Sequence, residues 1–186
     1  MNRDHELLRL LKSKLKRGEP PDPGSERTAS VAVAFKEGGH LKTLLIKRAN
    51  REGDPWSGQV AFPGGKRGRN DGSPLETAIR ETKEEVGIDL ARSATYLGHL
   101  GTLRTHTGMM LVVPCAFLVM ERVRVERNAE VASHRWVPVE AFLREGSRSA
   151  YILREGGNAV RLPAYLYRDF VIWGLTYRII STLIAR

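Results

Sequence analysis

The chain has 186 residues, of which 41% are hydrophobic and 27% are charged, which excludes a fibrous or wholly disordered protein. Its Lys and Arg residues outnumber Asp and Glu by 30 to 21, and the net charge of +9 favours anionic partners: nucleic acid, nucleotides, a membrane surface or phosphorylated metabolites. The single cysteine, Cys115, excludes an internal disulfide and is typical of a reducing compartment, so we expect a cytoplasmic location.

The first predicted element is a short amphipathic helix within residues 1–17, with leucines on or near one face. These leucines are Leu7, Leu8, Leu10, Leu11 and Leu15. Residues 18–26 are rich in Pro and Gly, which indicates a linker. We therefore predict an N-terminal helix and linker over residues 1–27 and one globular domain over residues 28–186.

The body of the chain predicts several strands with few helices between them. Strands are expected at 30–36 and 42–49 (joined at Gly38 and Gly39), 58–65, 94–100, 109–120 and 131–139, with a hairpin at 151–167 that turns at Gly156 and Gly157. Helices are expected at 73–86, 139–145 and 169–185. This order favours an α/β sandwich with a mixed sheet over a doubly wound parallel sheet.

No segment has the length and polarity expected of a membrane anchor. The N-terminal residues lack an apolar stretch long enough for a signal peptide. The most apolar segment, 169–185, is shorter than a membrane span and contains Arg178. We therefore expect no membrane partner.

The predicted helix at 73–86 has well-marked ends. Ser73 is a good N-cap, Pro74 suits the first helical position, and Glu76 completes a capping box. Gly87 is a natural residue just past the C-terminus. The helix is therefore expected to end directly after two glutamates.

Three carboxylates, those of Glu81, Glu84 and Glu85, crowd this helix end. Like charges repel, and the helix dipole disfavours anions at a C-terminus by about 0.3–1 kcal/mol each. Arg80 and Lys83 offset part of this. Two interpretations remain open: a solvated acidic face, or a ligand set for a hard cation such as Mg²⁺ or Mn²⁺.

The pattern around these residues resembles the Nudix box, a glycine loop followed by a helix that ends in Arg-Glu-x-x-Glu-Glu-x-Gly. The matching residues are Gly65, Arg80, Glu81, Glu84, Glu85, Gly87 and Ile88. The upstream stretch 44–65 resembles the signature of the Nudix branch that hydrolyses coenzyme A, and segments 96–119 and 172–180 are similar to that branch as well. The similarity covers roughly residues 30 to 185.

The resemblance implies a Nudix-type α/β/α sandwich and a Mg²⁺- or Mn²⁺-dependent hydrolase. Its substrate would be coenzyme A or a related nucleoside diphosphate derivative, cleaved by water at the diphosphate bond. It implies metal ligands at Glu81, Glu84 and Glu85, with Glu130 a further candidate. Glu84, or a residue outside the box, would take the proton from water.

The resemblance also implies supporting roles for other residues. Arg80 would orient Glu84 or a loop carboxylate through a charge-assisted bond. Arg48 and Gln59 would touch substrate phosphate or adenine, and Gly64 and Gly65 would let the backbone approach the helix and metal closely.

One position departs from the usual box. Asp71 stands six residues after Gly65, where the family has a glutamate, and the loop is one residue longer than usual. Asp71 either replaces that glutamate or caps the loop.

Two alternatives to the coenzyme A hypothesis remain. The first is a pyrophosphatase for ADP-ribose, a dinucleotide or a nucleoside triphosphate. The second is a nucleic-acid-binding module that uses the +9 charge. A nucleic acid partner is disfavoured by the crowded carboxylates and by the lack of an aromatic–basic RNA motif. We therefore expect a small-molecule substrate, and related enzymes suggest a homodimer.

Overall fold

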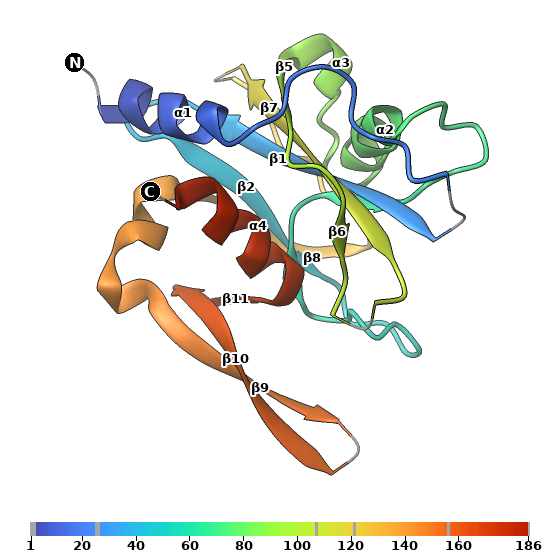
Figure 1. Ribbon diagram of the computed structural model, residues 1–186, viewed down its shortest axis with the longest axis vertical. Coiled ribbons are helices and arrows are strands. Elements are labelled where there is room, and N and C mark those ends of the chain that lie inside the picture. Colours follow the sequence, from blue (N-terminus) through green and yellow to red (C-terminus); the bar gives the residue numbers. More distant parts are fainter. Residues whose placement is uncertain (1–2, 25–26, 107, 121, 156, 186) are drawn as a thin grey trace.

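The computed structural model describes residues 3–24, 27–106, 108–120, 122–155 and 157–185. Within these ranges, eight strands form one sheet of order β3-β2-β1-β7-β5, with β4 on β1, β6 on β7 and β8 on β2 (Figure 1). These strands are β1 (Thr28–Lys36), β2 (Lys42–Arg48), β3 (Val60–Ala61), β4 (Gly64–Lys66), β5 (Ala94–His99), β6 (Leu103–Arg104), β7 (Leu111–Val119) and β8 (Val131–Pro138). The predicted mixed sheet is confirmed, because β1 runs parallel to β7 and antiparallel to β2.

A smaller antiparallel sheet follows in the chain, formed by β9 (Arg148–Glu155), β10 (Asn158–Tyr167) and β11 (Phe170–Trp173). Figure 1 shows its β9–β10 hairpin projecting from the body below α4. The helices are α1 (Arg3–Ser13), α2 (Pro74–Val86), α3 (Leu90–Ser93) and α4 (Gly174–Ile184), with 3₁₀ turns η1 (Val139–Leu143) and η2 (Glu145–Ser147).

The central strand β1 shows why the fold has three layers. Alternate residues of a strand point to opposite faces of its sheet. Val33 and Phe35 belong to the core beneath α1 and α4, whereas Ala32 and Ala34 belong to the core beneath α2. Both faces are thus covered by helices, and the expected α/β/α arrangement is confirmed.

Three predicted elements differ from the structure. The segment 169–185 is not one helix, because Phe170–Trp173 pairs with β10 before α4 begins at Gly174. The segment 58–65 is broken into β3 and β4, with the Pro63 carbonyl turned to accept a hydrogen bond from the Ala32 N–H. The short helix expected at 139–145 is present, but as a 3₁₀ helix that ends at Leu143.

Short elements were missed and one turn is only partly described. Neither α3 nor β6 was expected, since four-residue and two-residue elements leave no periodic pattern. The predicted hairpin at 151–167 is confirmed. Gly157 has a φ of 83°, as its turn requires, and Gly156 lies outside the described residues.

The N-terminal helix packs on the body of the fold. Leu7, Leu8 and Leu11 lie in the same core as Ile180 of α4. The Asp4 carboxylate accepts a hydrogen bond from the Leu41 N–H at 2.9 Å. The division at residue 27 remains a prediction. None of the helices in the described ranges has the length and apolar character needed to span a bilayer.

Leu11→Ala provides a test of this packing. Leu11 is 1% exposed, so truncation leaves a cavity and should lower the free energy of unfolding by about 2–5 kcal/mol. Leu10→Ala on the same helix is the control. Leu10 is only half-buried, so its truncation should lower the free energy of unfolding by less. Urea unfolding measures both. Equal losses would show that α1 contributes nothing specific to the core.

Candidate active site

The site begins at two glycines on β4. Gly64 pairs with Val31 of β1 and has a φ of 151°; a Cβ there would lie 2.3 Å from the Ser30 carbonyl oxygen. Only glycine tolerates this backbone and this close approach. The approach brings the Gly64 N–H to 2.9 Å from a carboxylate oxygen of Glu85, across the layer boundary between β4 and α2.

Glu85 is a buried carboxylate with few stabilising partners. Its side chain is 2% exposed, and its nearest cation, Arg48, lies 3.9 Å away through Nη1. Burial raises the pKa of Glu85 to about 7, although the Gly64 N–H and Arg48 act in the opposite direction. The charged form of this carboxyl is therefore disfavoured, because the Gly64 N–H and Arg48 only partly offset the cost of its burial.

Glu81 and Glu84 share one cation. The Arg80 Nη1 lies 2.9 Å from Glu81 and 3.1 Å from Glu84. Burial raises the pKa of Glu81, with the negative charges of Glu84 and Glu130 acting in the same direction. Glu84 is 56% exposed, so it faces solvent at the end of α2.

The Glu81 carboxylate lies directly over Gly65. A Cβ on Gly65 would lie 2.4 Å from the Glu81 Oε2, so a glycine here makes room for the carboxylate. Both glycines of the loop therefore serve close contacts, one with the backbone of β1 and one with an acidic side chain of α2.

Asp71 holds the other side of Arg80. Its two oxygens accept hydrogen bonds from the Arg80 Nε at 2.9 Å and Nη2 at 2.8 Å, a bidentate pair. They also accept from the Gly68 N–H and the Thr77 hydroxyl. The bond with Arg80 is the main cause that lowers the pKa of Asp71 to about 2. These contacts are those of a loop cap, one of the two roles left open for Asp71.

The helix boundaries follow the sequence closely. The Ser73 hydroxyl accepts a hydrogen bond from the Glu76 N–H, and Gly87 adopts a left-handed φ of 71°. The Glu76 carboxylate binds the Gly72 N–H, one residue before the position that a capping box predicts. Two hydrogen bonds therefore join the glycine loop to the first turn of α2.

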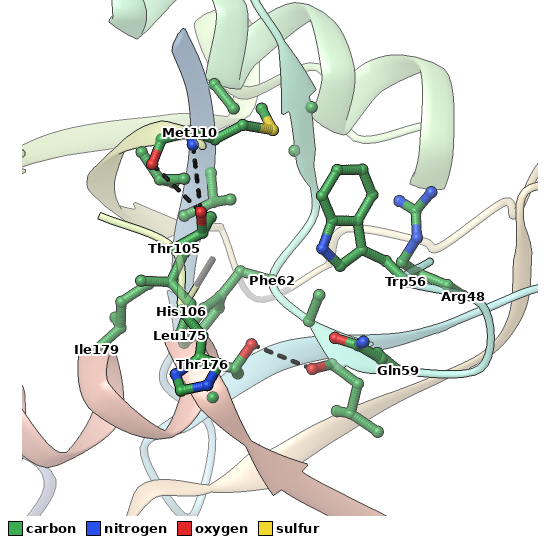
Figure 2. Close-up of a pocket in the computed structure, with 18 of the residues that line it drawn as sticks. Arg48, Trp56, Gln59, Phe62, Thr105, His106, Met110, Leu175, Thr176 and Ile179 are labelled. Carbon is green, nitrogen blue, oxygen red and sulfur yellow. Dashed lines mark hydrogen bonds between the residues drawn. The ribbon is translucent and has the colours of Figure 1, made fainter. Parts of the chain in front are cut away.

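A cavity of about 280 Å³ opens beside the two glycines (Figure 2). Arg48, Trp56 and Gln59 lie along one wall, and the Gln59 amide donates to the Pro55 carbonyl. The opposite wall comes from β9, β11 and α4. Its residues are Leu153, Trp173, Gly174, Leu175, Thr176 and Ile179.

Sequence reasoning did not find this second wall. Apolar residues such as Leu175 and Ile179 carry no chemical signature, and they lie more than 100 residues after Gly64 and Gly65. His106 also lines the cavity. The stacking of Tyr151 on Trp173, with ring centroids 4.1 Å apart, ties the wall to the hairpin.

The loop between β2 and β3 is held by two ion pairs. Arg48 binds Asp54 at 2.9 Å, and Arg51 binds Glu130 at 2.8 Å. The Glu130 charge contributes to the raised pKa values of Glu81 and Glu85, so Glu130 lies near both. Its role as a metal ligand remains a prediction.

The carboxylates suit a divalent cation by chemistry, although they are not gathered around one point. Among the described residues, no three His, Cys, Asp or Glu side chains are arranged to hold a metal ion. The donors are hard oxygens, and burial, followed by the neighbouring glutamate charges, raises the pKa of Glu81 and Glu85, a cost that a bound cation would offset. Coordination by all three box glutamates would require Glu81 and Glu84 to loosen their contacts with Arg80.

Comparison with known proteins decides the family. Residues 25–155 match the sequence model of the NUDIX domain, a range that includes the glycine loop and all of α2. The chain belongs to the Nudix hydrolase family. It is therefore an enzyme that hydrolyses phosphoanhydride bonds.

Two relatives illustrate the range of similarity. The Nudix hydrolase NudL of Yersinia enterocolitica is 37% identical over 142 residues, which cover 76% of this chain and 72% of that protein. The peroxisomal coenzyme A diphosphatase ndx-8 of Caenorhabditis elegans is 32% identical over 139 residues, covering 73% of this chain and 59% of that protein.

Solved Nudix structures share the fold. A MutT/nudix family protein from Enterococcus faecalis superposes with a TM-score of 0.55 at 22% identity, covering 96% of this chain and 67% of its own. An Ap4A hydrolase from C. elegans gives 0.51 at 23% identity, covering 60% and 80%. At this identity the comparison supports the architecture alone.

The two glycines should respond differently to alanine. In Gly64→Ala the new Cβ meets backbone atoms at an unfavourable φ, so the free energy of unfolding should fall by about 1–3 kcal/mol or more. In Gly65→Ala the atoms nearest to the new Cβ are those at the flexible end of Glu81, so the fold should survive while turnover falls. Urea unfolding and a hydrolysis assay separate the two effects. The reverse order of stabilities would contradict this geometry.

Asp71→Asn should show the pH dependence of the loop cap. The pKa of Asp71 is lowered from 3.8 to about 2 in the folded state, so its charge contributes about 2 kcal/mol above pH 4. At pH 7 the free energy of unfolding of the wild type should exceed that of Asp71→Asn by this amount. The difference should shrink as pH falls from about 4 to 2, where the wild-type carboxylate takes up its proton.

Chemical denaturation across this pH range measures the difference. Asp89→Asn is the control, since Asp89 pairs with Lys83 on the exposed side of the same helix. A gap between wild type and Asp71→Asn that stays constant down to pH 2 would contradict the assignment.

Proposed function

We propose that this enzyme is a Mg²⁺- or Mn²⁺-dependent diphosphatase acting on coenzyme A. Water would attack one phosphorus of the diphosphate, the P–O–P bond would break, and an adenosine bisphosphate and phosphopantetheine would leave. Support comes from the resemblance of residues 44–65 to the coenzyme A branch and from the 32% identity with a protein named as a coenzyme A diphosphatase.

The observation that carries the choice of substrate is the composition of the cavity. Its walls are mainly apolar, yet it begins at Gly64 and Gly65 beside the carboxylates of α2. Coenzyme A joins a charged nucleotide to a long uncharged arm through its diphosphate. ADP-ribose and dinucleotides instead have a polar sugar on both sides. An apolar chamber next to the reacting bond therefore favours the molecule with the uncharged arm.

The box glutamates Glu81, Glu84 and Glu85 would hold the cation, with Glu130 as a further candidate. A cation bound there supplies positive charge against the diphosphate and makes nearby water more acidic. The chain's own cations have separate tasks. Arg80 positions Glu81 and Glu84, and it is itself held by Asp71.

The remaining residues would bind substrate and move the proton. Glu84 is the most exposed of the box carboxylates and would take the proton from attacking water. The Arg48 Nε is buried and, among the described atoms, has no hydrogen-bond partner, so it can donate to a phosphate oxygen. Gln59 lines the same wall. A cytoplasmic location and a homodimer remain predictions.

Single Glu→Gln variants at Glu81, Glu84 and Glu85 test the site. Each should reduce turnover of coenzyme A by roughly 100-fold or more with the fold retained, because glutamine keeps the shape and removes the charge. Glu6→Gln on the exposed side of α1 is the control and should keep the wild-type rate. Product identification by chromatography and circular dichroism provide the two measurements.

A substrate panel decides between the hypotheses. Coenzyme A, ADP-ribose, a dinucleotide, a nucleoside triphosphate and an RNA oligomer are each assayed with Mg²⁺ and with Mn²⁺. Turnover of ADP-ribose with coenzyme A untouched would overturn the proposed substrate. Salt-sensitive RNA binding without hydrolysis of any compound would support the binding-module alternative instead.

A further inference from the structure

The segment between α1 and β1 lies along the body of the fold. In Figure 1 it is the dark-blue stretch that leaves α1 and passes α3 and α2. We call its described part, residues 14–24, the strap. Lys16 and His99 exchange backbone hydrogen bonds at 2.8 and 3.0 Å. The Tyr96 hydroxyl donates to the Gly18 carbonyl. The strap is therefore fixed to β5 before it reaches α2.

A glycine in β5 makes room for the strap. Gly98 has a φ of 133°, and a Cβ there would lie 2.4 Å from the Lys16 carbonyl oxygen. Any other residue would push the strap away from the strand. The close contact between the strap and β5 thus depends on a glycine at position 98.

The strap ends at the loop that carries Asp71. The Arg67 Nη1 donates to both carboxylate oxygens of Asp22, at 2.6 and 2.8 Å. The other nitrogens of the same guanidinium donate to the carbonyls of Asp71 at 3.2 Å and Gly72 at 3.3 Å. Arg67 therefore joins the strap to the backbone on which Asp71 sits.

A continuous series of contacts leads from there to the acidic helix end. Asp71 binds Arg80 through both of its oxygens, and Arg80 binds Glu81 and Glu84. Within the part of the chain that the structure describes, no hydrogen bond or ion pair joins the Asp22 side chain to any of these four residues. Its influence would pass through the position of the loop. Since Asp22 is 42% exposed, the ion pair adds little to global stability.

We infer that Asp22 is a positioning residue for the metal site: by anchoring Arg67, it fixes the loop that sets Asp71 and Arg80. The inference rests on the proposed function, because it assigns the box glutamates to a divalent cation. It makes the N-terminal segment part of the catalytic unit. A variant that releases the strap should bind the cation more weakly without unfolding.

Asp22→Asn is the main variant. Its dissociation constant for Mn²⁺, measured by calorimetry on the full chain, should rise roughly 3- to 10-fold, less than the 10- to 100-fold typical of residues that hold a ligand directly. The Mn²⁺ concentration for half-maximal hydrolysis should rise equally, with kcat at saturating Mn²⁺ unchanged. Asp22→Glu should restore wild-type binding, because the carboxylate is kept.

Arg67→Lys tests the same link from the other side. A lysine can pair with Asp22, but a single ammonium cannot also reach the Asp71 and Gly72 carbonyls in the fork geometry of a guanidinium. It should therefore weaken Mn²⁺ binding like Asp22→Asn. Asp169→Asn is the control: it removes a half-exposed aspartate that pairs with Arg135 of β8, outside the loop, and should leave Mn²⁺ binding unchanged.

Hydrogen exchange gives a readout that needs neither metal nor substrate. The Gly68 and Gly72 amides donate to Asp71 and Glu76, so both should exchange faster in Asp22→Asn than in wild type. Unchanged exchange and unchanged Mn²⁺ affinity would overturn the inference. If wild type itself binds no Mn²⁺, the proposed function fails, and unchanged exchange of the loop amides would then reject the strap's role separately.

Discussion

The structure around the acidic helix depends on one guanidinium. The Arg80 side chain forms ion pairs with Asp71, Glu81 and Glu84. It therefore connects the loop that carries Asp71 to the C-terminal end of α2. Its planar donors suit bidentate pairing with Asp71 while leaving Nη1 for the two glutamates. The bond with Asp71 is the main cause that raises the pKa of Arg80 further above its ordinary value, so the charge at this centre is constant.

Close approach is the second constraint on the site. Carboxylates at a helix C-terminus are unfavourable unless donors reach them. Gly64 brings a backbone N–H to the buried Glu85, and Gly65 leaves space for Glu81. The central strand β1 fixes both glycines through its pairing with β4. The acidic helix end and the middle of the sheet therefore depend on each other, although they lie far apart in the chain.

Segments near both ends of the chain contribute to the surroundings of this centre. Near the C-terminus, β11 and α4 form the apolar wall that supports the choice of substrate. Near the N-terminus, Asp22 reaches the loop through Arg67. Segments outside the family motif thus supply both a wall of the cavity and a brace for its loop. In the proposed function the glutamates would supply the chemistry, whereas these segments would define what is bound and how firmly the site is held.

Local patterns in the sequence determined the helix, its caps and the acidic cluster. Ser73 and Gly87 act on neighbouring residues, and the order of predicted strands and helices favoured a mixed sheet, because these signals can be read along the chain. Only the tertiary structure decided that Asp71 pairs with Arg80, that Phe170–Trp173 is a strand, and that residues such as Trp173 line the cavity. Those outcomes depend on contacts between distant segments, and residue spacing does not encode which distant segments meet.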